Sequence, residues 1–280
     1  MRKKPVRLVA SCLLGILALL AVWTLFIEPR RLVVHREEIE LPGWPKGTPA
    51  LKVALLSDLH VGSPHWGVSR LRALVEKTNG ENADVVVLAG DYVIDRVLFG
   101  TKVDQETIGA ELGNLRAPFG VVAVLGNHDW WNGGERMRRA LEAHGIVVLE
   151  NDVRTFVRDG KPIAIAGLAD AVTREPEPEL TFEKAPPESA LVAVVHEPDI
   201  FPSLGNRPAI TLAGHTHGGQ VRFPFIGSPV VPSDFGQRFV LGHIVEHGKH
   251  LFVTTGIGTS ILPVRFGVPP EIAILTLRSR

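Results

Sequence analysis

The stretch Leu212-Ala213-Gly214-His215-Thr216-His217-Gly218-Gly219-Gln220 decides how we interpret the rest of the chain. It continues an apolar run, residues 209–213, that is typical of a buried strand. Alternate side chains of an extended segment point the same way, so we expect His215 and His217 to project together. The glycines around them let the backbone turn tightly. Two neutral imidazoles aimed at one point suit a transition metal, although a His-x-His pair taken alone is more often two surface histidines.

The composition excludes several classes of protein. The 280 residues are 45% hydrophobic, which is enough for one large core or two modest ones. The formal net charge is zero and no basic block follows the first residues, so no nucleic-acid partner is expected. The single cysteine, Cys12, excludes a disulfide framework and a Cys-based zinc site. Any metal must be held by His, Asp, Asn or Glu, a set that suits Mn, Fe or Zn.

The N-terminus predicts a membrane anchor. Residues 1–7 form a basic tail, and the uncharged run 8–27 is about as long as a bilayer core requires. The run is too long for the apolar part of a cleaved signal peptide, and no small-x-small cleavage site follows it. Residues 9–12 resemble a lipoprotein box only superficially, because almost no apolar segment precedes Cys12. The slight excess of positive charge before the run places the globular part outside a bacterial inner membrane, on the periplasmic side.

The remaining chain divides into a linker and one domain. Residues 28–50 are rich in proline and glycine and are interpreted as a linker with one strand at 32–35, and the folded domain is expected at 51–280. Its first half repeats an apolar strand followed by a helical pattern, which predicts a largely parallel α/β layer. The strands are expected at 51–56, 84–89 and 120–125, and the helices at 67–77, 105–115 and 134–144.

The second half changes pattern after Gly145. Short segments separated by turn residues predict antiparallel edge strands at 146–149, 153–157 and 162–166. Buried strands are expected at 190–195 and 209–213, followed by a hairpin of 239–246 with 250–255. The last strand, 272–277, is expected to close the second sheet.

Polar residues follow five of the apolar strands. Parallel strands place their ligands at the carboxyl edge of the sheet, so these clusters are expected to meet there. Each cluster alone has an ordinary explanation, such as a helix cap, a turn or a buried histidine, but all five in this order are hard to reach by chance. The residues are Asp58 and His60, then Asp91, then Asn127 and His128, then His196, then His215 and His217.

These blocks resemble the five signature blocks of the calcineurin-like metallophosphoesterases over about residues 51–277. The sequences Gly256-Ile257-Gly258-Thr259-Ser260 and Pro263-x-Arg265 resemble the membrane-anchored bacterial branch of that family, with YaeI- and YkuE-type phosphodiesterases. The resemblance implies an α/β fold, a four-layer α/β/β/α sandwich of two mixed sheets, with two metal ions at one edge. It implies hydrolysis of a phosphoester by a hydroxide that bridges the two metals.

The resemblance also implies a role for each residue. One metal would be held by Asp58, His60 and His217, and the other by Asn127, His196 and His215. Asp91 would bridge the two, and His128 would protonate the leaving oxygen as general acid. The acidic partner of His128, either Asp58 or another carboxylate, is left open.

Other residues are candidates for substrate contacts. His65 and Trp130 follow the first and third blocks and could form an apolar wall for a lipid or aromatic group, with rim packing as the alternative. Arg265 could pair with a phosphate or with Glu271.

The resemblance to this branch favours cleavage of a diester or pyrophosphate rather than a monoester. The anchor favours a substrate in or near the bilayer, such as a phospholipid, a UDP-linked lipid precursor or an envelope polymer. A UDP-2,3-diacylglucosamine pyrophosphatase-like activity is one alternative, and a non-catalytic metal-binding scaffold is another. The oligomeric state is not predicted.

Overall fold

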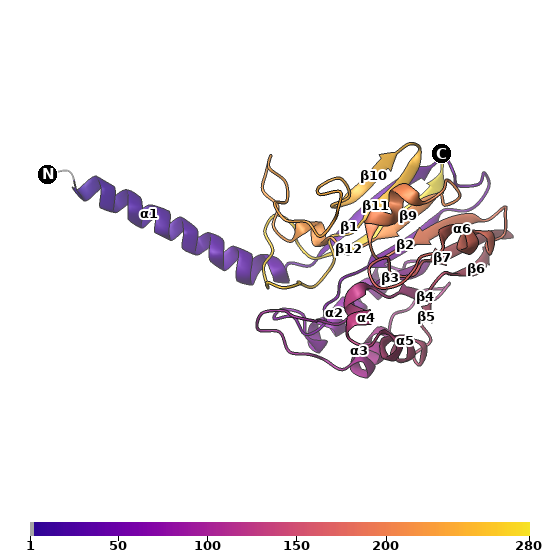
Figure 1. Cartoon of the computed structure of the whole chain (residues 1–280), viewed down its shortest axis with the longest axis horizontal. Coiled ribbons are helices and arrows are strands. Elements are labelled where there is room, and N and C mark those ends of the chain that lie inside the picture. Colours follow the sequence, from indigo (N-terminus) through magenta and orange to yellow (C-terminus); the bar gives the residue numbers. More distant parts are fainter. Residues whose placement is uncertain (1–2) are drawn as a thin grey trace.

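The computed structural model describes residues 3–280, and side chains from residue 8 onward. Two six-stranded sheets stack face to face and carry helices on their outer faces (Figure 1). This arrangement confirms the predicted four-layer sandwich of two mixed sheets. The predicted basic tail, residues 1–7, lies partly outside the described residues, and the division of the chain into domains stays a prediction.

The first sheet contains the three predicted strand–helix units. Strands β2, β3, β4 and β5 run parallel, whereas β12 runs antiparallel to β2 and parallel to β1 at the edge. In order across the sheet, the strands are β1 (Val33–Leu41), β12 (Glu271–Ser279), β2 (Leu51–Leu56), β3 (Val85–Ala89), β4 (Val121–Val124) and β5 (Val147–Val148). The helices are α2 (Val68–Gly80), α3 (Gln105–Leu112), α4 (Asn127–Trp131) and α5 (Gly134–Glu142).

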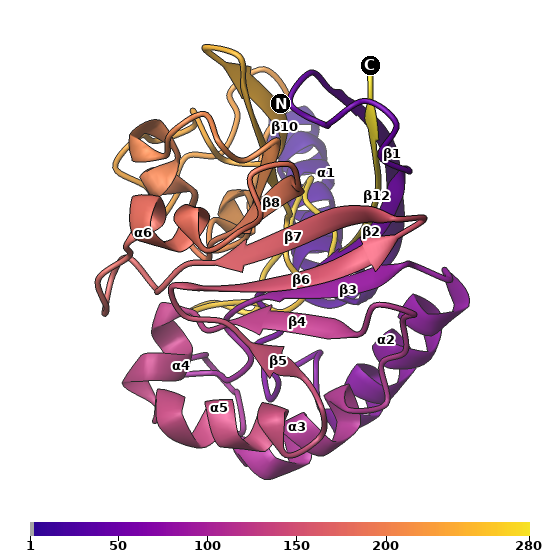
Figure 2. The same cartoon turned by 90° about the vertical axis from the view of Figure 1, so that its right-hand side faces the viewer.

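The second sheet has a parallel centre and antiparallel edges. Its inner strands pair in parallel, and β10 and β6 pair antiparallel at the two edges. In order, the strands are β10 (Gly242–Glu246), β11 (Lys249–Val253), β9 (Ile210–Ala213), β8 (Ala190–Val194), β7 (Lys161–Gly167) and β6 (Asp152–Arg158). Helix α6 (Pro178–Glu183) and the 3-10 helix Pro198–Ser203 cover its outer face. Figure 2 shows α6 on the side of the stack opposite α3 and α5.

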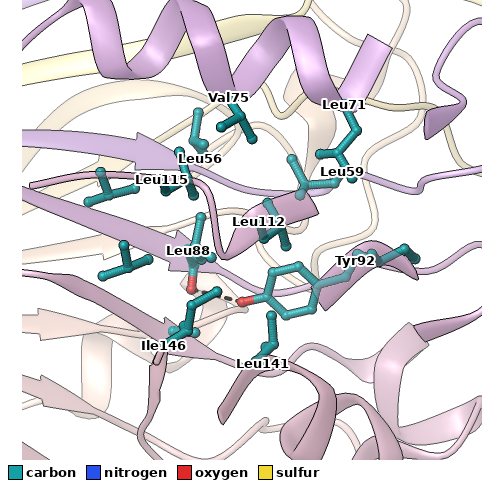
Figure 3. Close-up of a cluster of buried hydrophobic side chains, with 14 of the residues drawn as sticks. Leu56, Leu59, Leu71, Val75, Leu88, Tyr92, Leu112, Leu115, Leu141 and Ile146 are labelled. Carbon is teal, nitrogen blue, oxygen red and sulfur yellow. Dashed lines mark hydrogen bonds between the residues drawn. The ribbon is translucent and has the colours of Figure 1, made fainter. Parts of the chain in front are cut away.

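Three apolar layers hold the sandwich together. The alternation of side chains along each strand sends one set toward the helices and the other toward the facing sheet. Leu56 and Leu88 therefore pack under α2 and α3, whereas Leu55 and Val87 pack between the sheets. Figure 3 shows the layer beneath the helices, where the Tyr92 hydroxyl lies 3.2 Å from the carbonyl oxygen of Leu88. The same hydroxyl lies 2.8 Å from the carbonyl oxygen of Val124, to which it can donate instead.

Two predicted strands take other places in the fold. Strand β5 is parallel to β4 rather than antiparallel, because it completes another strand–helix–strand unit of the first sheet. The C-terminal strand, β12, does not close the second sheet but inserts in the first between β1 and β2. Strand β1 lies inside the segment interpreted as a linker, and it extends the expected strand to Leu41. All three differences come from pairings between segments far apart in the sequence.

The N-terminal helix α1 (Lys3–Val22) continues through a π-helix, Trp23–Ile27, and a 3-10 turn, Glu28–Arg30. Among the described residues it is the one helix long and apolar enough to cross a membrane, judged by length and composition. The C-terminal end of this helical segment is joined to the domain by hydrogen bonds to two backbone carbonyls. Thr24 accepts from the backbone N–H of Arg265 at 3.1 Å, and Pro29 accepts from the Trp66 indole at 2.9 Å.

Candidate metal centre

The predicted metal ligands lie together at the carboxyl edge of both sheets. The Asp91 Oδ2 atom lies 3.2 Å from His196 Nε2 and 3.6 Å from His60 Nε2. The His217 Nε2 atom lies 3.4 Å from Asp58 Oδ1 and 3.1 Å from His60 Nε2. All five side chains are buried. Two loops of the first sheet and two of the second thus supply one cluster of ligand atoms.

The remaining predicted residues border the same cluster. The rings of His215 and His196 lie 5.1 Å apart, centroid to centroid. Asn127 begins α4 and lines, with Asp91, His128 and His215, a cleft of about 480 Å³. The structure therefore brings together all eight residues of the five sequence blocks.

The backbone that presents these ligands is not extended, contrary to the expectation for His215 and His217. Both have a positive φ, 69° and 52°, and the same is true of Asp58 (53°), His60 (39°) and Asp91 (60°). Non-glycine residues rarely adopt this left-handed conformation, and it concentrates at functional sites where the surrounding structure enforces it. The ligands converge because the backbone turns sharply after each of these strands. Alternation of side chains along an extended strand is not the cause.

Glycines let the loops approach closely. A Cβ on Gly126 would lie 2.4 Å from Asp91 Oδ1 and 2.7 Å from His196 Nε2. A Cβ on Gly214 would lie 1.9 Å from the Ser57 hydroxyl and 2.7 Å from Asp58 Oδ2. Any larger residue at either position would displace a predicted ligand.

Hydrogen bonds to carbonyls orient two of the imidazoles. His60 Nδ1 lies 3.0 Å from the carbonyl oxygen of Val93, and His196 Nδ1 lies 2.7 Å from that of Ala89. A ring that donates through Nδ1 keeps Nε2 as the atom available for a metal. Both Nε2 atoms are directed into the cluster.

The electrostatics of the metal-free cluster favour three neutral imidazoles, together with one charged imidazole beside one charged carboxylate. Burial lowers the pKa of His60 and of His215 to about 4, and lowers that of His217 well below its usual range. Burial opposes ionisation of Asp91, but the neighbouring His196 and His60 hold its pKa well below the usual range. Burial also opposes the charged form of His196, but Asp91 raises the pKa of that ring well above its usual range.

Asp129 is a structural residue of the site that the sequence analysis does not single out. Its buried carboxylate accepts four backbone N–H groups: Asp91 at 2.8 Å, Tyr92 at 2.8 Å, Val93 at 3.3 Å and Gly126 at 3.0 Å. The loops after β3 and β4 are held together through this one side chain. Its place directly after Asn127 and His128 is the signal in the sequence that could have identified it.

The structure places His128 at the edge of the cluster. Its side chain is 17% exposed, and its Nε2 lies 4.0 Å from Asp91 Oδ2. Its backbone N–H donates to Asp91 Oδ1 at 2.9 Å. The carboxylate near His128 is therefore Asp91, whereas Asp58 accepts two bonds of 3.1 Å from the N–H of His215.

The three residues expected to contact substrate occupy other places. Arg265 is fully buried, and its guanidinium donates to the carbonyls of Gly258, Thr255 and Val268 rather than pairing with Glu271. The Nη2 of Arg265 lies 3.4 Å from His217 Nδ1, so it lies behind a predicted ligand.

His65 contacts the carbonyl of Leu25 at the end of the N-terminal helix. Trp130 packs away from the cleft under Arg174, whose guanidinium carbon lies 4.4 Å from the ring centroid. Trp131, its neighbour, lines the cleft instead and is 56% exposed.

The residues present fit a pair of metal ions. Two groups of closely spaced donors, Asp58–His60–His217 and Asp58–Asp91–His196, have ligand atoms within 4.8 Å of one another. The buried Asn127 Oδ1 and His196 Nε2 have no hydrogen-bond partner, although His196 Nε2 is close to Asp91 without hydrogen-bond geometry. Buried polar atoms are normally satisfied, and a bound metal would account for both: it would accept the lone pair of Asn127 Oδ1 directly, and that of His196 Nε2 once the ring has lost its proton. Imidazole, carboxylate and amide donors suit Mn, Fe or Zn, and the structure does not identify which.

Comparison with known proteins agrees with this geometry. Residues 51–219 match the family described as Calcineurin-like phosphoesterase. The uncharacterized metallophosphoesterase YkuE of Bacillus subtilis is 31% identical over 91% of this chain and 88% of its own length. Phosphodiesterase YaeI of Escherichia coli is 29% identical over 81% of this chain and 82% of its own. A zebrafish (Danio rerio) protein described as a transmembrane protein with metallophosphoesterase domain is 31% identical over 94% of this chain and 61% of its own length.

Proposed function

The chain belongs to the calcineurin-like phosphoesterase family and is a metal-dependent phosphoester hydrolase, and we propose that it cleaves a phosphodiester or pyrophosphate bond in a membrane- or envelope-associated substrate. The proposal depends above all on the convergence of eight polar side chains at one end of the cleft. The preference for a diester is supported by the similarity to YaeI, whose name is phosphodiesterase.

We assign the metal-holding residues in two sets that share Asp91. Asp58, His60 and His217 would hold one ion, and Asn127, His196 and His215 the other. Two bound ions would supply Lewis acidity and a water of lowered pKa. Neutral imidazoles keep the loaded site positive, which favours an anionic phosphoester.

His128 is the residue we assign as general acid. It borders the cleft, it is partly exposed, and its backbone N–H is fixed to Asp91 at 2.9 Å. The Nδ1 atom of its ring is buried and has no hydrogen-bond partner. A proton held on the ring edge that faces the cleft can pass to the departing oxygen, and the ring can later take up a proton from solvent.

The test uses the full chain in detergent with added Mn²⁺ and bis-p-nitrophenyl phosphate. We expect His128→Ala to lower kcat by about 10²–10⁴-fold with unchanged metal content. The loss should grow when the leaving phenol is more basic, because such a leaving group depends more on protonation. We expect Asp91→Ala to lose both metal and activity, and His144→Ala, an exposed control on the surface, to change neither.

Two results would contradict these assignments. A wild-type rate no higher than that of Asp91→Ala would favour the non-catalytic scaffold of the same fold. A His128→Ala loss that is the same for every leaving group would remove the general-acid role while leaving the hydrolase intact.

The location of the domain is also a proposal. The apolar helix supports a single-pass anchor in a bacterial inner membrane, with the domain on the periplasmic side. Alkaline phosphatase fused after Arg280 should be active if the domain lies outside. An inactive alkaline phosphatase fusion together with a fluorescent green fluorescent protein fusion would reverse the orientation. That result would favour a substrate made at the cytoplasmic face, such as UDP-2,3-diacylglucosamine.

A further inference from the structure

Large apolar side chains are exposed on three loops around the mouth of the metal cleft. We name as the apolar rim six residues of these loops, each of which is at least 49% exposed. They are Leu98, Phe99, Phe225, Ile226, Ile261 and Leu262. Single exposed apolar residues are ordinary, but a contiguous group of them on a protein surface marks a binding surface.

Backbone hydrogen bonds join the three loops into one surface. The N–H of Leu98 donates to the carbonyl of Ile261 at 2.9 Å, which connects the first loop to the third. The N–H of Arg222 donates to the carbonyl of Phe266 at 2.7 Å, which connects the second loop to the third. The segment 260–266 therefore holds the whole apolar rim in a fixed arrangement.

The same segment is attached to the end of the apolar N-terminal helix. The N–H of Arg265 donates to the carbonyl of Thr24 at 3.1 Å, within the π-helix that continues α1. Figure 1 shows the loops between β9 and β10 and between β11 and β12 at the end of the domain from which α1 extends. A bilayer that contains α1 would thus lie against the apolar rim.

The apolar rim also borders the catalytic cleft. Among the six residues of the apolar rim, Ile261 lines the cleft. The apolar side chains of Val230, Val231 and Trp131 line it as well, and so do Asp91 and His128. A substrate that enters between these loops meets apolar side chains before it meets the metal ligands. That order suits a molecule with a lipid portion and a phosphoester head.

We propose that the apolar rim inserts into the interfacial layer of the phospholipid bilayer that holds α1, so that the cleft receives lipid-linked phosphoesters directly from the membrane surface. The proposal rests on the hydrolase function and on the anchor proposed above. The bilayer is favoured over a protein partner because the hydrogen bond to Thr24 makes the apolar rim continuous with the end of the apolar helix.

Depth-dependent quenching in proteoliposomes tests the proposal. The full chain carries Cys12→Ser and one new cysteine labelled with an environment-sensitive fluorophore, in vesicles of phosphatidylethanolamine and phosphatidylglycerol. Phe225→Cys and Phe99→Cys report on the apolar rim, and their exposed side chains can be replaced without disturbing a core. Leu17→Cys in α1 is the positive control. Val157→Cys, an exposed apolar residue on β6, is the matched negative control.

We expect both rim labels to shift their emission to the blue and to lose intensity when shallow doxyl-labelled lipids are present. The Leu17 label lies near the middle of the apolar run 8–27 and should be quenched most by deep doxyl-labelled lipids, and the Val157 label should stay unchanged with either lipid. Rim labels that behave like Val157 would overturn the proposal. Rim labels that are shielded from water but not quenched by lipid would also overturn it, in favour of a protein partner.

Hydrolysis of bis-p-nitrophenyl phosphate by the same proteoliposomes separates this proposal from the proposed function. Activity without rim quenching removes the membrane contact alone. Rim quenching without activity in Mn²⁺-loaded protein supports the membrane contact and removes the hydrolytic assignment on which the substrate class depends.

Discussion

Asp129→Asn tests whether one carboxylate fixes the loops that carry the metal ligands. Each oxygen of Asp129 accepts two backbone N–H groups, from Asp91 and Gly126 on Oδ2 and from Tyr92 and Val93 on Oδ1. Asparagine keeps the shape but replaces one oxygen by an NH₂ group, so two donors lose their acceptor. A buried donor that loses its acceptor costs about 1–3 kcal/mol, so the loss of two acceptor contacts should lower the free energy of unfolding by roughly 2–6 kcal/mol. That loss is a large fraction of the about 5–15 kcal/mol typical of a domain.

Urea unfolding of the full chain in detergent, followed by the fluorescence of its five tryptophans, measures this change. The matched control is Asp104→Asn, an exposed N-cap of α3 whose carboxylate accepts from the Thr107 N–H at 2.8 Å. Asparagine caps a helix about as well as aspartate, so the control should stay within about 0.5 kcal/mol of wild type. The reasoning about Asp129 is refuted if its variant unfolds at the same urea concentration as this control.

Two further predictions concern metal uptake. Asp91 raises the pKa of His196, so the metal-free protein holds a proton on this ring. A metal ion that binds the ring must displace this proton. The apparent affinity for Mn²⁺ should therefore rise with pH, by up to about tenfold per pH unit for each proton released. Titration calorimetry in buffers of different ionisation enthalpy measures that release, and an affinity that does not change with pH would contradict it. Gly126→Ala should weaken metal binding by about 10–100-fold, the range found when the groups that orient ligands are disturbed, because its Cβ would meet Asp91 and His196. Gly80→Ala, where a Cβ would meet nothing within 4 Å, should leave the affinity unchanged in the same titration.

The site residues could be predicted because the pattern that identifies them lies within single short segments of the sequence. A buried strand followed by a polar cluster is visible in a single segment, and parallel strands place all such clusters at one edge. This is why His60, Asp91 and His196 could be named together before their distances were known. The direction in which the backbone turns after each strand could not be predicted, because a left-handed residue such as His215 is enforced by neighbours from other segments.

In short elements, the sequence also fails to predict which way a single side chain points. Adjacent residues of a helix point about 100° apart, so one of Trp130 and Trp131 faces the cleft and the other does not. Which one does so depends on where the five-residue helix α4 begins and how it packs. Arg265 likewise carries a charge that suggests a phosphate ligand, and only the folded chain shows its guanidinium surrounded by three carbonyls.

The sequence by itself determined the two α/β layers, the apolar helix, the identity of the eight clustered residues and the family, because each is encoded in local spacing and residue type. Tertiary structure alone decided that β12 lies in the first sheet, that Asp129 clamps two loops, and that the exposed apolar loops meet beside the helix end. Those features depend on pairings between segments separated by scores of residues, and the free energy of such pairings is set by packing that no single segment contains.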